Sequence, residues 1–457
     1  MKAAGETPSG FADKALYYLA AILVGVATGL IGTALHLAVD RALTWPAVLR
    51  AHVGLDGPHF LLLTAAVSAA LVLAAVWLVR TFVPEAGGSG VQEVEGAMEG
   101  RRTIRWSRVL PVKFVGGLLS LGSGLVLGRE GPTIHMGASV AQAAAQGFKL
   151  PTMESRGLLA AGAAAGLAAA FSAPLASVLF VIEETRRQFP YSLKTYTGVM
   201  IASVVSVVVL ELLAGSRPFM AMTVPDLQLS FLPAFVLLGL LLGVAGVVFN
   251  RCLIWALDMA LALGRRTSFY LLPAVVGCAI GVLLVVQPEA TQGGDMLALT
   301  LVRENLPLAT IAIVVLVRFV MTLASYATGV PGGIFAPILA LATALGLLFA
   351  LCLELVAPLP AGAPSALAVA AMGGLFSSTI RAPLVGVVLI AELTGAYTML
   401  LPTLVTCMLA NLVADALGGR PIYEVLLERT LRLAGETPSS ARPAANVALP
   451  IGGWDQR

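Results

Sequence analysis

The chain has 457 residues, of which 58% are hydrophobic and 12% are charged, whereas a soluble protein carries about 25% charged residues. The mean hydropathy of +0.92 excludes an ordinary soluble domain, and a net charge of only +3 gives no reason to expect a nucleic-acid partner. Apolar runs such as 16–39 and 60–79 are long enough to cross about 30 Å of hydrocarbon as helices. The period-two alternation of a membrane β-barrel is absent from the sequence. These features predict an all-α polytopic membrane protein.

Basic residues gather in three short loops between the apolar runs. By the positive-inside rule, such loops face the cytoplasm, and the residues concerned are Arg101, Arg102, Arg105, Arg108, Arg186, Arg187, Lys194, Arg265 and Arg266. The segments 46–59, 213–227 and 287–297 carry fewer basic residues, so we expect them outside. Both termini are then cytoplasmic, with the polar segments 1–14 and 433–457 as tails.

The membrane part contains two pairs of similar stretches. Residues 112–138 and 317–343 align without a gap at an offset of 205 and share Val, Phe, Val, Leu, Ser, Gly, Gly and Pro. Residues 173–183 and 382–392 align at an offset of 209 and share Ala-Pro-Leu, a valine and the final glutamate. Duplicated halves are typical of secondary transporters. The pattern predicts a first membrane repeat over 15–215, a linker over 216–224 and a second membrane repeat over 225–432.

Glycine and proline interrupt the apolar runs at corresponding places in the two halves. In chain order the interruptions read "AGGSGV" (86–91), "GREGP" (128–132), "APL" (173–175), "GVPGGIFAP" (329–337) and "APL" (382–384). Proline suits the first position of a helix, so we expect helices that start inside the membrane at Pro132 and Pro337. Free backbone N–H groups and a partial positive charge at such a start form an anion site. The amides around Ser89, with its hydroxyl, offer a third set of donors.

Arg129 and Glu130 place a charged pair inside an otherwise uncharged glycine-rich run. Ionisable residues within a membrane are expensive and mark functional sites by default. The Glu130 carboxylate would sit where an anion binds, and it can swing away when it is protonated. The alternative is that Glu130 is a first-turn acid favoured by the helix dipole and paired with Arg129.

Glu183 and Glu184 are adjacent on one expected helix and point about 100° apart. Glu183 aligns with Glu392 in the second repeat, which favours a structural role shared by both halves, whereas Glu184 faces Leu393. The alternative for Glu184 is an acid that neutralises Arg186 or Arg187. No other titratable side chain is evident between Glu184 and Glu130.

These motifs closely resemble the CLC family of chloride channels and chloride/proton antiporters, over nearly the whole membrane part. "GSGVQEVEG", "GREGP" and "GGIFAP" are similar to three family signatures, and the tyrosine of "GGRPIYEVL" is similar to its late chloride-site tyrosine. The resemblance implies an inverted repeat of two halves with about eighteen short, tilted, partly broken helices. It also implies a homodimer in membrane lipid that transports chloride and protons in a bacterial inner membrane. No cofactor and no cytoplasmic regulatory domain pair are expected.

The resemblance implies a set of chloride-binding and proton-transfer residues. Hydroxyls for the central chloride come from Ser89, beside Gly90, and from Tyr423. Backbone amides come from Ile334 and Phe335, and those of Arg129, Glu130 and Gly131 line the outer part. Glu130 is then the gate, and Glu184 matches the inner proton-transfer glutamate that antiporters have and most channels lack. In the family a proline at the position of Ser89 accompanies a preference for nitrate.

Two departures from the family pattern stand in the first motif, where Val91 replaces isoleucine and Gln92 replaces proline. Fluoride is disfavoured because fluoride-specific relatives differ in the "GREGP" segment. A passive chloride channel of the same fold is the nearer alternative to an antiporter. An intramembrane serine protease is the enzymatic alternative, since "GGSG" (87–90) fits a Gly-x-Ser-Gly pattern. Its base would have to be His135, the only histidine after Ser89, and we expect no enzyme.

Overall fold

The computed structural model describes residues 11–54, 57–185, 192–215, 220–222, 224, 228–303 and 306–435. In the first half the elements are α1 (Phe11–Ala42), α2 (Trp45–Val53), α3 (Pro58–Phe82), η1 (Pro84–Ala86), α4 (Val91–Met98), α5 (Trp106–Gly122), α6 (Glu130–Gly147), α7 (Thr152–Phe171), α8 (Pro174–Thr185) and α9 (Leu193–Ala214). In the second half they are η2 (Leu229–Phe231), α10 (Leu232–Arg266), α11 (Leu271–Val286), η3 (Pro288–Ala290), α12 (Asp295–Arg303), α13 (Leu308–Ala327), α14 (Phe335–Glu354), α15 (Ala363–Ile380), α16 (Pro383–Thr394), η4 (Tyr397–Met399), α17 (Leu400–Ala416) and α18 (Ile422–Leu433). The all-α fold and the expected number of helices are confirmed for these residues.

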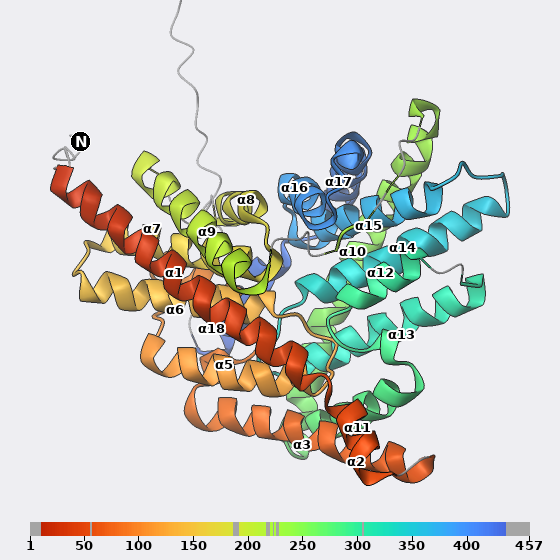
Figure 1. Ribbon diagram of the computed structural model, residues 1–457, viewed down its shortest axis with the longest axis horizontal. Helices are drawn as coiled ribbons and strands as arrows, with labels where there is room; N and C mark the ends of the chain where they lie inside the picture. The colour runs from red at the N-terminus through yellow and green to blue at the C-terminus, as the bar shows by residue number, and fades with distance from the viewer. Residues whose placement is uncertain are drawn as a thin grey trace, which may run out of the picture.

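The helices of the two halves lie mostly on opposite sides of the molecule, with α1 and its neighbours on the left of Figure 1 and α12 to α17 on the right. Eight helices of the described residues are long and apolar enough to cross a membrane. The helix α1 begins at Phe11, within the segment expected as a tail. The expected loop residues Arg186 and Arg187, most of both tails and most of the linker lie outside the described residues.

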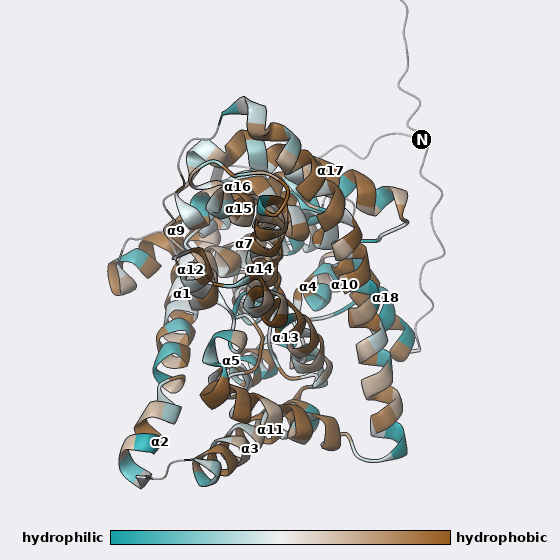
Figure 2. Cartoon of the chain, turned by 90° about the vertical axis from the view of Figure 1, so that its right-hand side faces the viewer, coloured by the Kyte–Doolittle hydropathy of each residue, from teal (hydrophilic) through white to brown (hydrophobic). Residues whose placement is uncertain are grey.

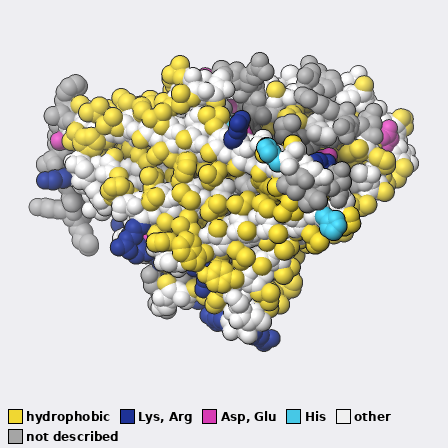
Figure 3. Space-filling view, turned by 60° about the horizontal axis from the view of Figure 1, so that its bottom comes forward, with side chains coloured by type: hydrophobic (Ala, Val, Ile, Leu, Met, Phe, Trp, Pro, Cys, Tyr) yellow, Lys and Arg dark blue, Asp and Glu magenta, His cyan; other side chains and the backbone are white. Residues whose placement is uncertain are grey.

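The surface is as apolar as a membrane-embedded protein requires. Figure 2 shows hydrophobic residues along the central helices α13, α14 and α15, and hydrophilic ones mainly on α2, α18 and the helix ends. Leu212 is 80% exposed and Val356 is 84% exposed. In the view of Figure 3 hydrophobic side chains cover most of the described face. Exposed apolar area of this extent is rare in soluble monomers and marks contact with lipid or with another subunit.

The predicted breaks coincide with helix starts. The helices α4, α6, α8, α14 and α16 begin at Val91, Glu130, Pro174, Phe335 and Pro383. The expectation that Pro132 and Pro337 occupy the first helical position was wrong, because each is the third residue of its helix. None of the first four N–H groups of a helix has an intrahelical acceptor, so proline is tolerated there as well as at the first position.

The loops before α4, α6 and α14 bind each other at the centre of the molecule. Gly88 donates its N–H to the Val330 carbonyl at 3.0 Å, and its own carbonyl accepts the N–H of Gly332 at 3.1 Å. Gly128 and Gly333 exchange two hydrogen bonds, of 2.8 and 2.7 Å. These bonds satisfy backbone groups that would otherwise be unpaired in the membrane, where each unsatisfied group costs several kcal/mol. The three helix starts are thereby held together.

Each half uses a buried cation to fix the loop that follows its 3₁₀ turn. Lys113 on α5 donates to the carbonyls of Ala86 at 3.0 Å and Gly88 at 2.8 Å. Arg318 on α13, which aligns with Lys113, donates to three consecutive carbonyls, those of Thr291, Gln292 and Gly293, at 2.8 to 3.1 Å. Both cationic side chains are fully buried. The repeat-related charges therefore bind backbone dipoles.

Glu183 and Glu392 exchange equivalent contacts between the two halves. The Glu392 carboxylate, at the end of α16, accepts the N–H groups of Leu175 at 3.1 Å and Ala176 at 2.7 Å, at the start of α8. The Glu183 carboxylate, at the end of α8, accepts the Val385 N–H at 3.0 Å, at the start of α16. An acid near a helix N-terminus accepts hydrogen bonds from the free backbone N–H groups there and is favoured by the helix dipole. The structural role predicted for Glu183 from its repeat partner is confirmed.

We expect Glu392→Ala to destabilise the fold by about 2 kcal/mol, because two amides at the start of α8 lose a charged acceptor. The measurement is the apparent melting temperature of the purified protein in detergent, which should fall by several degrees. Glu354→Ala is the matched control, since Glu354 is an exposed acid at the end of α14. Equal melting temperatures for the two variants would contradict the assigned capping role.

Candidate functional site

Ser89 and Tyr423 bring two hydroxyl groups to the point where the central helices begin. Ser89 belongs to the loop before α4, and Tyr423 is the second residue of α18. Both residues are fully buried, and neither hydroxyl oxygen has a hydrogen-bond partner among the described residues. An unsatisfied buried hydroxyl is costly, and binding of an ion is one explanation for it. Because the two side chains lie beside each other, they indicate a ligand site.

The starts of α6 and α14 complete this site. A Cβ atom at Gly131, the second residue of α6, would lie 2.5 Å from the Ser89 Oγ atom. The ring of Phe335, the first residue of α14, lies 5.7 Å from the Tyr423 ring, measured between centroids. The first backbone N–H groups of each helix have no intrahelical acceptor. The site therefore combines hydroxyls and amides and holds the predicted residues Ser89, Gly131, Phe335 and Tyr423.

The remaining predicted backbone positions adjoin the same helix starts. Ile334 is the N-cap residue of α14, Arg129 is the N-cap residue of α6, and Gly90 is the N-cap residue of α4. Gly90 adopts a left-handed φ of +89°, and a Cβ atom there would overlap the His135 ring. Only glycine satisfies both conditions, so the sequence motif is explained by the backbone turn and by the close approach of α6.

Glu130 is the first residue of α6 and is 1% exposed. Its carboxylate lies over the backbone of the two paired glycines, since a Cβ atom at Gly128 would overlap it and one at Gly333 would lie 3.0 Å from the Oε2 atom. Negative charge is favoured at this place because it is the positive end of α6. Glu130 thus lies between the Ser89 site and the cavity described next.

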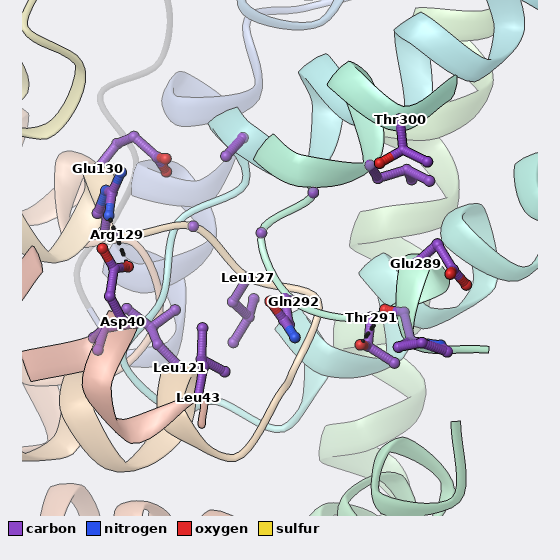
Figure 4. Close-up of a pocket in the computed structure, with 17 residues that line it drawn as sticks. Asp40, Leu43, Leu121, Leu127, Arg129, Glu130, Glu289, Thr291, Gln292 and Thr300 are labelled. Atoms are coloured by element: carbon purple, nitrogen blue, oxygen red, sulfur yellow. Dashed lines mark hydrogen bonds and ion pairs between the residues drawn. The ribbon is translucent and has the colours of Figure 1, made fainter. Parts of the chain in front are cut away.

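A cavity of about 340 Å³, which we call the outer cavity, lies between the end of α1 and η3 and includes Glu130 in its lining. Figure 4 shows Glu130 above the ion pair of Arg129 and Asp40, whose closest atoms are 3.7 Å apart. The backbone of residues 291–294, held by Arg318, forms the opposite wall. The guanidinium of Arg129 therefore contributes positive charge to this cavity, partly balanced by a carboxylate.

Glu184 lies near the end of α8 and lines a different cavity, of about 320 Å³. The other charged residues of this inner polar cavity are Glu183, Arg381, Asp415, Arg420 and Glu424. Glu184 is half-buried and so can exchange protons with water in the cavity. The inner polar cavity shares no lining residue with the outer cavity, so Glu184 and Glu130 line different cavities.

Glu95 on α4 was missed by the sequence analysis. It is 1% exposed, neither of its oxygens has a hydrogen-bond donor among the described residues, and its carboxylate faces Glu184. Glu95 therefore adds a titratable side chain beside Glu184 that was not expected, on the helix that begins two residues after Ser89. The signal available in the sequence was a short acidic helix that contains both Glu93 and Glu95. In the structure Glu93 is paired with Arg102 at 2.9 Å, whereas Glu95 has no ion pair among the described residues.

The geometry does not support a serine protease. Such an enzyme needs a hydrogen bond from its serine to a histidine base. The Ser89 hydroxyl is bound neither to a ring nitrogen of His135 nor to any other acceptor among the described residues. His135 instead fills the space beneath Gly90.

Comparison with known proteins agrees with the all-α fold described above. The family model described as "Voltage gated chloride channel" matches residues 70–415. The chain is 41% identical over 438 residues to the H(+)/Cl(-) exchange transporter ClcA of Vibrio campbellii, covering 94% of this chain and 92% of that protein. It is 40% identical over 425 residues to the protein of the same name from Salmonella schwarzengrund, covering 91% of this chain and 89% of that protein.

Solved structures are similar over almost the same length. The crystal structure of a slow cyanobacterial Cl-/H+ antiporter matches with a TM-score of 0.87 and 38% identity, over 92% of this chain and 99% of that chain. A eukaryotic CLC transporter matches with a TM-score of 0.77 and 25% identity, over 91% of this chain and 74% of that chain. Together with the apolar helices, these findings show an integral membrane protein, and the chain belongs to the voltage gated chloride channel family, the CLC family.

Proposed function

We propose that the chain exchanges chloride for protons across the membrane through the site between Ser89 and Tyr423. The observation that carries this proposal is the pair of buried hydroxyls without partners, which lie at the starts of α6 and α14. The sequence relatives named as exchange transporters and the similar cyanobacterial antiporter support the same activity. Chloride and protons are the substrates, and no cofactor takes part.

Neutral donors suit an ion that must bind and leave again. Conduction requires binding that is favourable enough for entry and weak enough for release. The hydroxyls of Ser89 and Tyr423 and the amides of Ile334 and Phe335 are the proposed ligands, and the amides from Arg129 to Gly131 line the outer part. The cationic groups of Lys113 and Arg318 bind backbone carbonyls and are not ligands of the ion in this proposal. They still raise the local positive potential that attracts anions.

Glu130 is the proposed gate between the outer cavity and the chloride site. As a carboxylate it occupies the positive end of α6, where it competes with chloride for the same amides. When a proton binds the carboxylate, the neutral acid loses that electrostatic attraction and moves toward the outer cavity. Chloride then takes the vacated place. Because a proton must bind Glu130 before chloride takes its place, the movement of chloride is coupled to the movement of protons.

Protons reach Glu130 from the other side through Glu184. Glu184 takes protons from water in the inner polar cavity. Glu95 lies beside Glu184 and belongs to α4, the helix that begins just after Ser89. The side chain of Glu95 shortens the stretch that water must bridge. This arrangement favours an antiporter over a passive chloride channel of the same fold, which would have no use for a proton site at Glu184.

The cellular setting extends the same proposal. The chain works as a homodimer in the lipid of a bacterial inner membrane. Both termini lie in the cytoplasm, as the positively charged loops favour. The apolar face in Figure 3 supplies area for lipid and for a second subunit. The direct test is purified protein in liposomes with a chloride gradient and an external pH electrode. Uphill proton movement supports the antiporter, and chloride flux without proton movement identifies a channel.

Glu130→Gln should abolish proton coupling while chloride still passes, because the amide carries no charge and takes up no proton in this pH range. We expect proton flux to fall to that of protein-free liposomes, measured with the pH electrode under a chloride gradient. Glu289→Gln is the matched control, since Glu289 is an exposed acid that lines the same cavity. Coupled proton pumping by Glu130→Gln would exclude the gate.

Glu184→Gln should reduce proton flux at least about tenfold, which corresponds to a barrier raised by about 1.4 kcal/mol. The side chain keeps its size but no longer accepts a proton, so chloride binding, measured by calorimetry, should change little. The neighbouring variant Glu183→Gln should keep the wild-type proton-to-chloride ratio and lower the melting temperature, because Glu183 caps α16. A wild-type ratio in Glu184→Gln would place the inner proton site elsewhere.

Ser89→Pro should raise the ratio of nitrate to chloride transport, because it removes both the hydroxyl and the backbone N–H of Ser89. Ser89→Ala removes the hydroxyl alone and should weaken chloride binding by about 1 kcal/mol, as expected for loss of one neutral hydrogen bond. Anion exchange in liposomes and calorimetry measure the two effects. Unchanged selectivity and affinity in folded variants would mean that Ser89 does not bind the ion.

A further inference from the structure

A third cavity, of about 370 Å³, reaches the backbone next to Ser89 and shares no lining residue with the outer cavity. It lies between α3, α10, α11 and α18, and its lining includes Gly87 and Gly88 of the loop that ends at Ser89. Arg80 and Arg429 also line it. This side carries the basic segments around Arg101 and Arg265, which the charge pattern places in the cytoplasm. We call it the inner anion cavity.

Tyr326 forms the floor of the inner anion cavity. It is the penultimate residue of α13, it is 3% exposed, and its hydroxyl oxygen accepts the Ser89 N–H at 3.4 Å. A Cβ atom at Gly88 would lie at the same distance from that oxygen. The Tyr326 hydroxyl thus contacts the backbone of Ser89, while the Ser89 hydroxyl belongs to the chloride site proposed above.

The loop under Tyr326 is fixed by several hydrogen bonds, whereas the Tyr326 hydroxyl is bound to it by one. Lys113 holds the Gly88 carbonyl at 2.8 Å, and Gly88 is also bonded to Val330 and Gly332. The bond from Ser89 to Tyr326 is long and is therefore weak. Among the described residues nothing accepts a hydrogen bond from the Tyr326 hydroxyl, so its proton is available to an anion.

The repeat shows that this hydroxyl is not a requirement of the fold. At the offset of 205, Tyr326 aligns with Leu121, which lines the outer cavity as Tyr326 lines the inner one. The equivalent place in the first half therefore works with an apolar side chain. The hydroxyl is specific to the inner end of the path.

We propose that the Tyr326 hydroxyl is the inner barrier for anions: it occupies the Ser89 amide and must release it before an anion passes between the inner anion cavity and the Ser89–Tyr423 site. The inference rests on the proposed function, because it needs an anion path through Ser89. It assigns to Tyr326 a role separate from those of Glu130 and Glu184, since it concerns entry of the anion and not movement of the proton.

The test uses the Glu130→Ala variant as background, so that the outer glutamate no longer limits passage. Adding Tyr326→Phe keeps the ring and removes the hydroxyl, and passive chloride efflux from liposomes should rise about two- to tenfold, the range allowed by loss of one neutral hydrogen bond. Tyr326→Leu, measured in the same way, should also accelerate efflux. The control is Tyr397→Phe, since Tyr397 is 62% exposed and lines none of the three cavities.

A second readout separates a barrier from a structural role. With Glu130 intact, Tyr326→Phe should keep the wild-type proton-to-chloride ratio, because the proton residues are untouched. Unchanged or slower efflux in the Glu130→Ala background, or a collapsed ratio with Glu130 intact, would overturn the proposal. Failure of the proposed function is distinguishable, because it shows as wild-type protein that moves no protons or no chloride.

Discussion

Backbone amides that begin helices inside a membrane must be satisfied, and this constraint governs the whole centre of the molecule. Hydrocarbon offers no acceptor, so non-helical backbone survives there only when it is buried in protein or lines a polar path. The helices α4, α6 and α14 begin at such places. Some of the loop groups are satisfied by bonds between the halves, as between Gly128 and Gly333. The amides left over at the helix starts are available to an anion or to the Glu130 carboxylate.

The two halves solve this problem with matched residues. Lys113 and Arg318 bind loop carbonyls in equivalent places, and Glu183 and Glu392 bind the amides of each other's partner helix. Ser120 and Ser325, also aligned in the repeat, bind loop backbone at Pro331 and Val126 of the opposite half. The charged groups with structural duties are thereby bound to backbone dipoles, whereas Glu130 and Glu184, which align with Phe335 and Leu393, are left for transport.

Sequence reasoning located the features that depend on local chemistry. Glycine and proline marked the helix starts, and the repeat distinguished Glu183 from Glu184. The position of Pro132 was off by two residues because proline is compatible with any of the first helical positions. Features that arise from packing were not readable: Glu95 lies only six residues after Ser89, yet its burial beside Glu184 depends on how α4 packs against α6, α7 and α18. The same holds for Tyr326, which reaches Ser89 across 237 residues of sequence.

The central claim is that neutral hydroxyls and amides at the starts of the broken helices bind the transported anion. Bromide can replace chloride in crystals and is located directly by its anomalous scattering. The account predicts an anomalous peak within contact of the Ser89 hydroxyl, the Tyr423 hydroxyl and the amides of Ile334 and Phe335. Bromide bound instead at Lys113 or Arg318, with none beside the two hydroxyls, would contradict it.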